Sequence, residues 1–344
     1  MAGEVAVRET ALLGAAVKYN PHLWGASELR EIFVVRQGEL QRLQGALRAS
    51  KPGLVPQHIL ITGQRGMGKS TLLQRLALAV REDETLGAKW IPLTFPEEQY
   101  TVSTLAEFWR NVLDALADAL QREGAAVEEL AALDRKIKSL GDILIDLREE
   151  SALEALRSWV REHKRGVLLL IDSTDQLFSA LGASVHGAKP QAAKSRNARR
   201  ATKAGSTDLW RLRKSLSHET GIFWIGASYQ ALEASDLYHD TFHDFFELLE
   251  LRPLSLAEMR TAMLALARVF GADSVGVWLL TEDDDQVMVP VQGYRVPPER
   301  LDELRGMRLS VVDHPIYAEG LRTRRPVFVP DTSADPRVTR WLVA

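Results

Sequence analysis

The sequence has no cysteine among its 344 residues. Disulfides, thiolate metal sites and thiol nucleophiles are therefore excluded. No apolar run approaches the roughly 20 residues that a membrane-spanning helix needs. The first residues, MAGEVAVRET, also lack the basic region followed by an apolar core that marks a secretion signal. These absences predict a cytoplasmic protein that does not enter a membrane.

The chain also has little excess charge of either sign, with 43 Lys and Arg against 46 Asp and Glu and a net charge of -3. This balance argues against attraction of the whole surface to nucleic acid, so any basic footprint must be local. The apolar share of 46% is that of an ordinary globular protein with a sizeable core. The length predicts about two domains.

One stretch, residues 58–76, has the sequence HILITGQRGMGKSTLLQRL. A short apolar run leads into a loop with three glycines, followed by Lys-Ser and an apolar-periodic helix. This is the G-x-x-x-x-G-K-[ST] pattern in the strand-loop-helix context that it requires. Glycines let successive backbone N–H groups face phosphate oxygens, and the positive end of the helix dipole points at the same anion.

The loop therefore predicts a site for ATP with Mg²⁺. We expect Lys69 to reach the β- and γ-phosphates and the Ser70 hydroxyl to ligate Mg²⁺. The alternative is a chance glycine-rich turn, which the flanking strand and helix disfavour. Residues 33–35 are candidates for an adenine contact, with plain core as the alternative. The expected nucleotide contacts are Gly63, Gln64, Arg65, Gly66, Met67, Gly68, Lys69, Ser70 and Thr71.

Five apolar runs predict strands, separated by stretches with helical periodicity. This alternation predicts an α/β fold of the P-loop NTPase type, with a parallel five-stranded sheet sandwiched by helices and a ligand at the carboxyl ends of the strands. Helices are expected at 103–123 and 151–163, with a charged amphipathic stretch at 127–148 between them. The expected strands are 58–62, 90–95, 167–172, 222–227 and 245–251.

Two of these strands end in polar residues suited to the phosphate site. Asp172 follows the run VLLLI, where it could hold Mg²⁺ through water, although a buried strand also ends in Asp by chance. Ser228 follows the fourth strand and either senses the γ-phosphate or only starts a loop.

The sequence offers several candidates for the residue that activates the attacking water. Ser173 stands after Asp172, where many ATPases carry a glutamate. Asp175 is the nearest acid, and Glu97 and Glu98 are remoter candidates. The alternative is that none of them acts as a base and hydrolysis is slow.

A basic segment at about 182–206 is rich in Ala, Gly and Ser and contains no acid. It predicts a flexible loop, because it cannot bury enough apolar surface to fold alone. The segment could contact nucleic acid or an acidic partner, but no aromatic residue is interleaved to stack on bases, so a solvated loop is favoured. Its cations are Lys189, Lys194, Arg196, Arg199, Arg200 and Lys203.

Several motifs together carry a family resemblance: GQRGMGKSTLL, WIPLTFPEEQY, LLLIDSTDQLF, IGAS and LELRPLSLAEM. In this order, over about residues 20–259, they resemble a bacterial AAA-type ATPase of the group that includes origin-recognition and signal-transduction (STAND) ATPases. The resemblance implies an ATP-binding core in which Lys69, Ser70 and Asp172 take the roles given above. Such ATPases continue into a helical lid, which is not evident here.

The remainder of the chain looks like part of a GAF domain, a small sensory module. A leading helix at 256–270, a hairpin pattern and the segment 318–331 carry this resemblance, with Arg324 and Arg325 in place of the usual glycine beside Pro326. The expected domains are therefore 1–255, an AAA-type ATPase, and 256–344, a partial α+β GAF-like domain. The alternative for the second is an unusual sheet appended to the ATPase.

Three functions are compatible with these patterns. The first is a regulatory ATPase that couples Mg-ATP binding and hydrolysis to a GAF sensory module in signal transduction or transcriptional control. The second is a switch or scaffold that binds ATP without turnover, and the third, resting on the basic segment alone, is a DNA-handling ATPase. The expected partners are ATP, a further copy of the chain, and an unidentified small molecule or protein at the GAF-like domain, with nucleic acid disfavoured.

Overall fold

The computed structural model describes residues 24–51, 53–95, 102–183, 208–229, 239–242, 244–269, 275–281, 286–294, 306–323, 327, 329 and 334–338. The described chain forms two compact units that meet in sequence between Pro253 and Leu254. Each unit has its own sheet. Within the described residues, no helix is long and apolar enough to cross a bilayer.

The first unit is built on a five-stranded sheet with the order β2-β3-β4-β1-β5, in which every neighbouring pair is parallel. Strands β1 and β4 are buried along their whole length, because helices cover both faces of a parallel sheet. The prediction of an α/β fold with a parallel five-stranded sheet is thus confirmed. The strands are β1 (Ile59–Thr62), β2 (Trp90–Thr94), β3 (Gly166–Ile171), β4 (Ile222–Ser228) and β5 (Glu247–Glu250).

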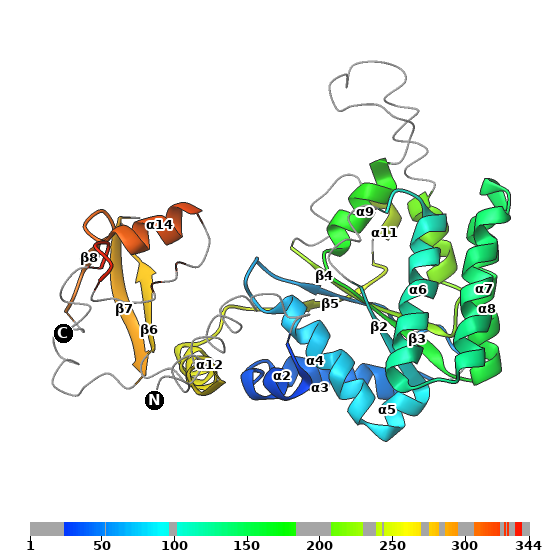
Figure 1. Ribbon diagram of the computed structural model, residues 1–344, viewed down its shortest axis with the longest axis horizontal. Coiled ribbons are helices and arrows are strands. Elements are labelled where there is room, and N and C mark those ends of the chain that lie inside the picture. The colour runs from blue at the N-terminus through cyan, green and yellow to red at the C-terminus, as the bar shows by residue number, and fades with distance from the viewer. Residues whose placement is uncertain are drawn as a thin grey trace, which may run out of the picture. The chain divides into compact units, whose positions relative to one another are not determined.

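One face of this sheet is covered by the helices that flank the glycine-rich loop (Figure 1). Alternate strand residues such as Ile59 and Ile61 point to this face and pack in one core with Leu72 and Leu76. These helices are α2 (Ala26–Ile32), α3 (Gln37–Ala49), α4 (Lys69–Glu82) and α5 (Glu84–Lys89).

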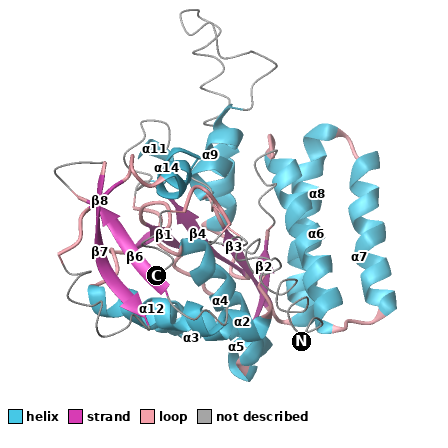
Figure 2. Cartoon of the chain, turned by 60° about the vertical axis from the view of Figure 1, so that its left-hand side comes forward, coloured by secondary structure: helices cyan, strands magenta, loops and turns pink. Residues whose placement is uncertain are grey.

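The opposite face packs against long helices, among which α6 lies beside α7 and α8 (Figure 2). Leu60, Leu169 and Trp224 face this side and pack with α6 residues such as Phe108 and Leu116. The elements are α6 (Leu105–Glu123), α7 (Val127–Ser139), the 3₁₀ turn η3 (Leu140–Asp142), α8 (Ile145–His163), α9 (Thr174–Ala183), a helix at 208–216 and α11 (His239–Phe242).

Two expectations about these helices need correction. The charged stretch 127–148 is not one element, because α7 ends at Ser139 and α8 begins at Ile145, before the expected start at 151. The helix expected at 103–123 begins at Leu105, and its N-cap is Thr104. Thr104 and Glu107 form a strict capping box, in which Glu107 N donates to Thr104 Oγ1 at 3.2 Å and Thr104 N donates to the Glu107 carboxylate at 3.2 Å.

The second unit contains an antiparallel sheet with the order β6-β7-β8. Its core gathers Met288, Leu309 and Val311, with Trp278 and Tyr317 packed against them. The elements are α12 (Leu256–Val269), β6 (Val275–Leu280), β7 (Val287–Tyr294), β8 (Leu309–Ser310) and α14 (Pro315–Thr323). The basic segment from residue 184 to 206, and most of 318–331 beyond α14, lie outside the described residues.

Candidate functional site

The glycine-rich loop connects β1 to α4 with a backbone that its residue types dictate. Gly66 and Gly68 have φ of 85° and 84°, a left-handed conformation that is strained for any residue with a Cβ. Gly68 is the N-cap of α4. The first N–H groups of a helix have no partner within the helix, and Gln64, Arg65 and Gly66 are exposed to solvent. The loop therefore offers backbone donors at an open surface.

Gly63 is required for a different reason, because the loop passes close to the end of β5 at this point. A Cβ at Gly63 would lie 3.1 Å from the Leu251 carbonyl oxygen and 3.2 Å from Leu251 Cβ. Leu251 N in turn donates to Thr62 O at 2.8 Å. The first residue of the loop is thus packed against the segment that leaves the sheet after β5.

Lys69, the first residue of α4, folds back over the loop. Its Nζ donates to Gly63 O at 2.5 Å and to Gln64 O at 2.9 Å. Partial burial lowers the pKa of Lys69, and the carboxylates of Asp172 and Asp175 act in the opposite direction. The ammonium group therefore lies within electrostatic range of both acids, which the sequence had placed at the same site.

Asp172 lies in a tight turn between β3 and α9. Its Oδ1 accepts a hydrogen bond from Ser173 N at 2.9 Å, and Ser173 has a left-handed φ of 52°. Thr174 is fully buried below the turn and donates to Ile171 O at 3.3 Å. A Cβ at Gly226 on the neighbouring strand would overlap the Thr174 hydroxyl. The turn that carries Asp172 is therefore seated on a glycine of β4.

Ser228 is the last residue of β4 and is buried. It lies in register with Thr62, the last residue of β1 before the glycine-rich loop. The structure thus gathers Gly63, Gln64, Arg65, Gly66, Met67, Gly68, Lys69, Ser70, Thr71, Asp172, Asp175 and Ser228 at the carboxyl edge of the sheet. Glu97 and Glu98 lie outside the described residues.

Arg36 is a buried residue near this edge that the sequence analysis missed. It is the N-cap of α3, has a φ of 65°, and donates through Nη2 to Arg252 O just beyond β5. Its Nη1 lies 3.0 Å from Glu39 Oε1, while Nε has no hydrogen-bond partner among the described residues. Phe33 in the preceding stretch packs in the core with α3 and α4. In the sequence, Arg36 is marked only as an arginine that directly follows the apolar run FVV.

The residues present fit a magnesium ion bound together with phosphate. Mg²⁺ takes oxygen ligands and is held by one or two protein groups, with substrate phosphates and waters completing the shell. Ser70 and Asp172 supply a hydroxyl and a carboxylate at this edge. Among the described residues, no group of three or more His, Cys, Asp and Glu could hold a metal by itself. A metal here would therefore depend on the phosphates of a nucleotide.

Comparison with known protein families gives a match for part of the chain. Residues 32–188 match the AAA ATPase domain family. The matched segment is less than half of the chain, and it includes the glycine-rich loop, α4, β3 and Asp172. The sequence matches no curated protein.

Several solved structures are similar to this chain at low sequence identity. Cdc6p of Pyrobaculum aerophilum is 15% identical, with a TM-score of 0.37 over 68% of this chain and 50% of that one. The ORC1 protein of Aeropyrum pernix in complex with DNA is 15% identical, with a TM-score of 0.42 over 86% of this chain and 63% of that one. The ORC2 protein of the same organism is 16% identical, with a TM-score of 0.43 over 68% of this chain and 52% of that one. The chain thus spans about half to under two thirds of these proteins.

Proposed function

We propose that the first unit binds Mg-ATP with the phosphates on the glycine-rich loop. The observation that carries this proposal is that Lys69 folds back over a loop opened by two left-handed glycines, within electrostatic range of Asp172 and Asp175. Lys69 would exchange the carbonyl oxygens of Gly63 and Gln64 for the β- and γ-phosphates. Ser70 and Asp172 would hold Mg²⁺, which neutralises charge on the phosphates when bound.

We further propose that the site hydrolyses ATP. The reaction should be slower than in ATPases that have a glutamate where this chain has Ser173. Water attacks the γ-phosphorus in line with the bond to the β–γ bridging oxygen, that bond breaks, and ADP leaves. Asp175 would accept a hydrogen bond and then the proton from the water. Ser228, at the end of β4, would contact the γ-phosphate.

The test is phosphate release by the full chain with ATP and Mg²⁺. Lys69→Ala should abolish release, whereas Lys138→Ala, an exposed lysine on α7, should leave it unchanged. Asp175→Asn should lower turnover while ATP still binds, because the change removes the base for the attacking water but no ligand of the phosphates. Equal rates in wild type and Lys69→Ala would end the enzymatic proposal.

A second candidate is a switch that holds ATP without appreciable turnover. The observation in its favour is Ser173, which places a hydroxyl and a left-handed backbone where a water-activating glutamate would otherwise stand. The nucleotide that remains bound after purification separates the two candidates. ATP recovered intact supports the switch, and ADP supports turnover.

We also propose that the second unit is a GAF-like sensory module in regulation, and that its state is coupled to the nucleotide bound by the first unit. What supports it is the antiparallel β6-β7-β8 sheet with α12 and α14, together with the short connection from β5 to α12. Hydrogen exchange of the β7 amides in the full chain, with and without ATP, tests the coupling. Exchange rates that do not respond to ATP would contradict it.

A further inference from the structure

The helix at 208–216 presents an aromatic residue to solvent. Leu209, Leu212 and Leu216 are fully buried and fix the inner face of this helix. Trp210 lies on the other side and is 47% exposed. Tryptophan is mostly buried in folded proteins, and an exposed one is typical of binding surfaces. Packing in the core of the first unit therefore does not account for a tryptophan at position 210.

A neighbouring arginine positions the indole ring. The guanidinium carbon of Arg213 lies 5.5 Å from the centroid of the Trp210 ring and 5.2 Å from that of Phe245. Arg213 also donates through Nη1 to Thr241 O. These contacts hold the guanidinium between two rings by cation–π attraction and anchor it to α11. Trp210 is thus supported from one side and open on another.

The exposed face around Trp210 carries two cations. Lys214, one helical turn further on, is exposed and has no ion-pair partner among the described residues. Arg211 is exposed too, although Glu149 and Asp208 pair with it. Lys214 is therefore the cation of this helix face that no acid among the described residues pairs with.

The sequence strengthens this local charge. Residues 184–218 contain nine Lys and Arg against one acid, in a chain whose net charge is -3. The residues up to 207 lie outside the described part of the chain. The rest of the chain has 34 Lys and Arg against 45 Asp and Glu, so the excess of positive charge in the sequence lies in this region.

We propose that the exposed face of Trp210, Arg211 and Lys214 binds single-stranded nucleic acid. A base stacks on the Trp210 indole, and Lys214 and Arg211 contact the adjoining phosphates. Single strands are the class that fits, because only unpaired bases can offer a face to a single exposed ring. The basic segment itself has no aromatic residue that could stack on a base. Trp210, seven residues after Lys203, supplies one.

The experiment measures binding of the full chain to a fluorescein-labelled oligothymidylate of about 20 nucleotides, longer than one module covers. Fluorescence anisotropy is recorded between about 50 and 200 mM salt. Trp210→Leu keeps an apolar side chain but removes the stacking ring, and Trp210→Phe keeps a smaller ring. Stacking predicts that Trp210→Leu weakens binding about 5- to 150-fold, while Trp210→Phe stays close to wild type.

The phosphate contacts are tested by charge removal. Lys214→Gln should weaken binding and reduce the slope of log affinity against log salt by about 0.7. Lys138→Gln, on α7, removes the same charge elsewhere and should change neither. Circular dichroism and the ATP affinity of each variant report whether the first unit remains folded.

Three results would overturn the proposal. One is wild-type affinity in the Trp210→Leu variant, since an apolar contact without stacking would then suffice. Another is equal competition by a DNA duplex or by polyglutamate, which would mean that the surface reads negative charge alone or an acidic protein. The third is no measurable binding of the oligonucleotide at the lowest salt.

Discussion

The ammonium group of Lys69 donates to the carbonyl oxygen of Gly63 at 2.5 Å, across the glycine-rich loop and within electrostatic range of two carboxylates. This relationship makes Lys69 the positive charge that balances Asp172 and Asp175. Removing it leaves two negative groups facing an incoming polyanion. The effect on nucleotide affinity should therefore exceed the loss of the direct contact to phosphate.

We predict that Lys69→Met weakens ATP binding about 10- to 100-fold, the range for losing a charged hydrogen bond. Adding Asp175→Asn should restore part of the affinity but none of the turnover, because it removes repulsion without replacing the lysine. Titration calorimetry of the two variants measures this. If the double variant binds no better than Lys69→Met, Asp175 does not face the phosphates.

A second prediction concerns the seat of the Asp172 turn. In Gly226→Ala the new methyl group overlaps the Thr174 hydroxyl and lies 2.6 Å from the position of Trp224 Nε1. Overpacking of this kind costs about 1–3 kcal/mol of unfolding free energy, and displacement of Thr174 should move Asp172 and lower ATP turnover. Urea unfolding and phosphate release measure the two effects.

The control for this change is another glycine-to-alanine substitution. Gly45 in α3 has open space around it. Gly45→Ala should raise the unfolding free energy by about 0.5–1 kcal/mol, because alanine loses less backbone entropy in a helix. Destabilisation by both substitutions alike would contradict the packing argument at Gly226.

The strands and the loop could be predicted from the sequence because their signals are local. The run at 222–227 is continuous and apolar, and β4 exceeds it by one residue. The order β2-β3-β4-β1-β5 depends on contacts between distant residues, and only the parallel class followed from the pattern. The break between α7 and α8 was missed because the residues on both sides remain amphipathic.

Conformations that tertiary structure imposes could not be read from residue types. Arg36 and Ser173 both have a positive φ, which neither residue type favours. A distant contact accompanies it at Arg36, which donates to Arg252 O, whereas at Ser173 the contact is local, because its amide donates to the side chain of Asp172. The groups of the candidate site with the strongest sequence signal were therefore predicted, whereas the residues that hold them in place were not.

A third prediction follows from His58, a buried residue directly before β1. Its Nε2 donates to Leu216 O at 3.1 Å and its Nδ1 accepts from Trp224 N at 3.2 Å, so the ring is neutral. Burial lowers the pKa of His58 from 6.5 to about 4, and the hydrogen bond to Leu216 opposes this in part. The unfolded chain therefore binds one more proton than the folded protein between these pH values.

Stability should accordingly fall as the pH decreases from 6.5 to 4, with a contribution from His58 of at most about 3 kcal/mol. Above pH 6.5 this contribution is constant, because the ring is neutral in both states. His58→Gln retains the donor to Leu216 and cannot titrate. Its unfolding free energy, measured by urea at several pH values, should decline less steeply than that of wild type in this window, and parallel curves would refute the assignment.

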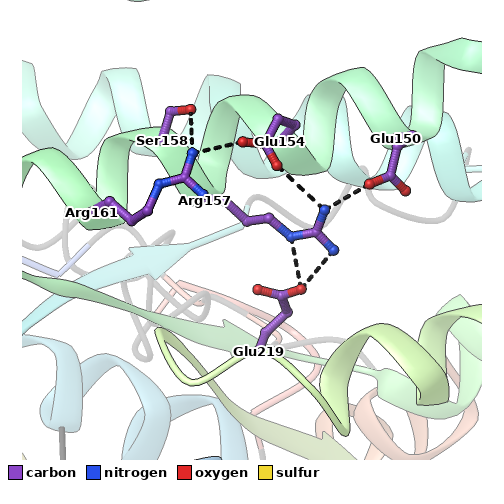
Figure 3. Close-up of polar contacts among 6 residues, drawn as sticks. All are labelled: Glu150, Glu154, Arg157, Ser158, Arg161 and Glu219. Carbon is purple, nitrogen blue, oxygen red and sulfur yellow. Dashed lines mark hydrogen bonds and ion pairs between the residues drawn. The ribbon is translucent and has the colours of Figure 1, made fainter. Parts of the chain in front are cut away.

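The fourth prediction concerns the ion-pair cluster that ties α8 to the residues before β4 (Figure 3). Arg157 lies at its centre, with Nε 2.8 Å and Nη2 2.7 Å from Glu219 Oε1, and Nη1 2.7 Å from Glu150 Oε1. The hydrogen bond to Glu219 is the main cause that raises the pKa of Arg157. Glu219 is largely buried, with 14% of its side chain exposed, whereas 70% of Glu150 is exposed.

Because the Glu219 pair is the better shielded, Arg157→Met should lower the unfolding free energy by about 1–3 kcal/mol. Arg157→Lys should recover only part of this, since an ammonium group cannot form the two-point contact. Glu150→Ala should cost much less, because solvent screens an exposed pair. A double-mutant cycle between Arg157 and Glu219 isolates the interaction, and a coupling energy near zero would show that the cluster does not hold α8 in place.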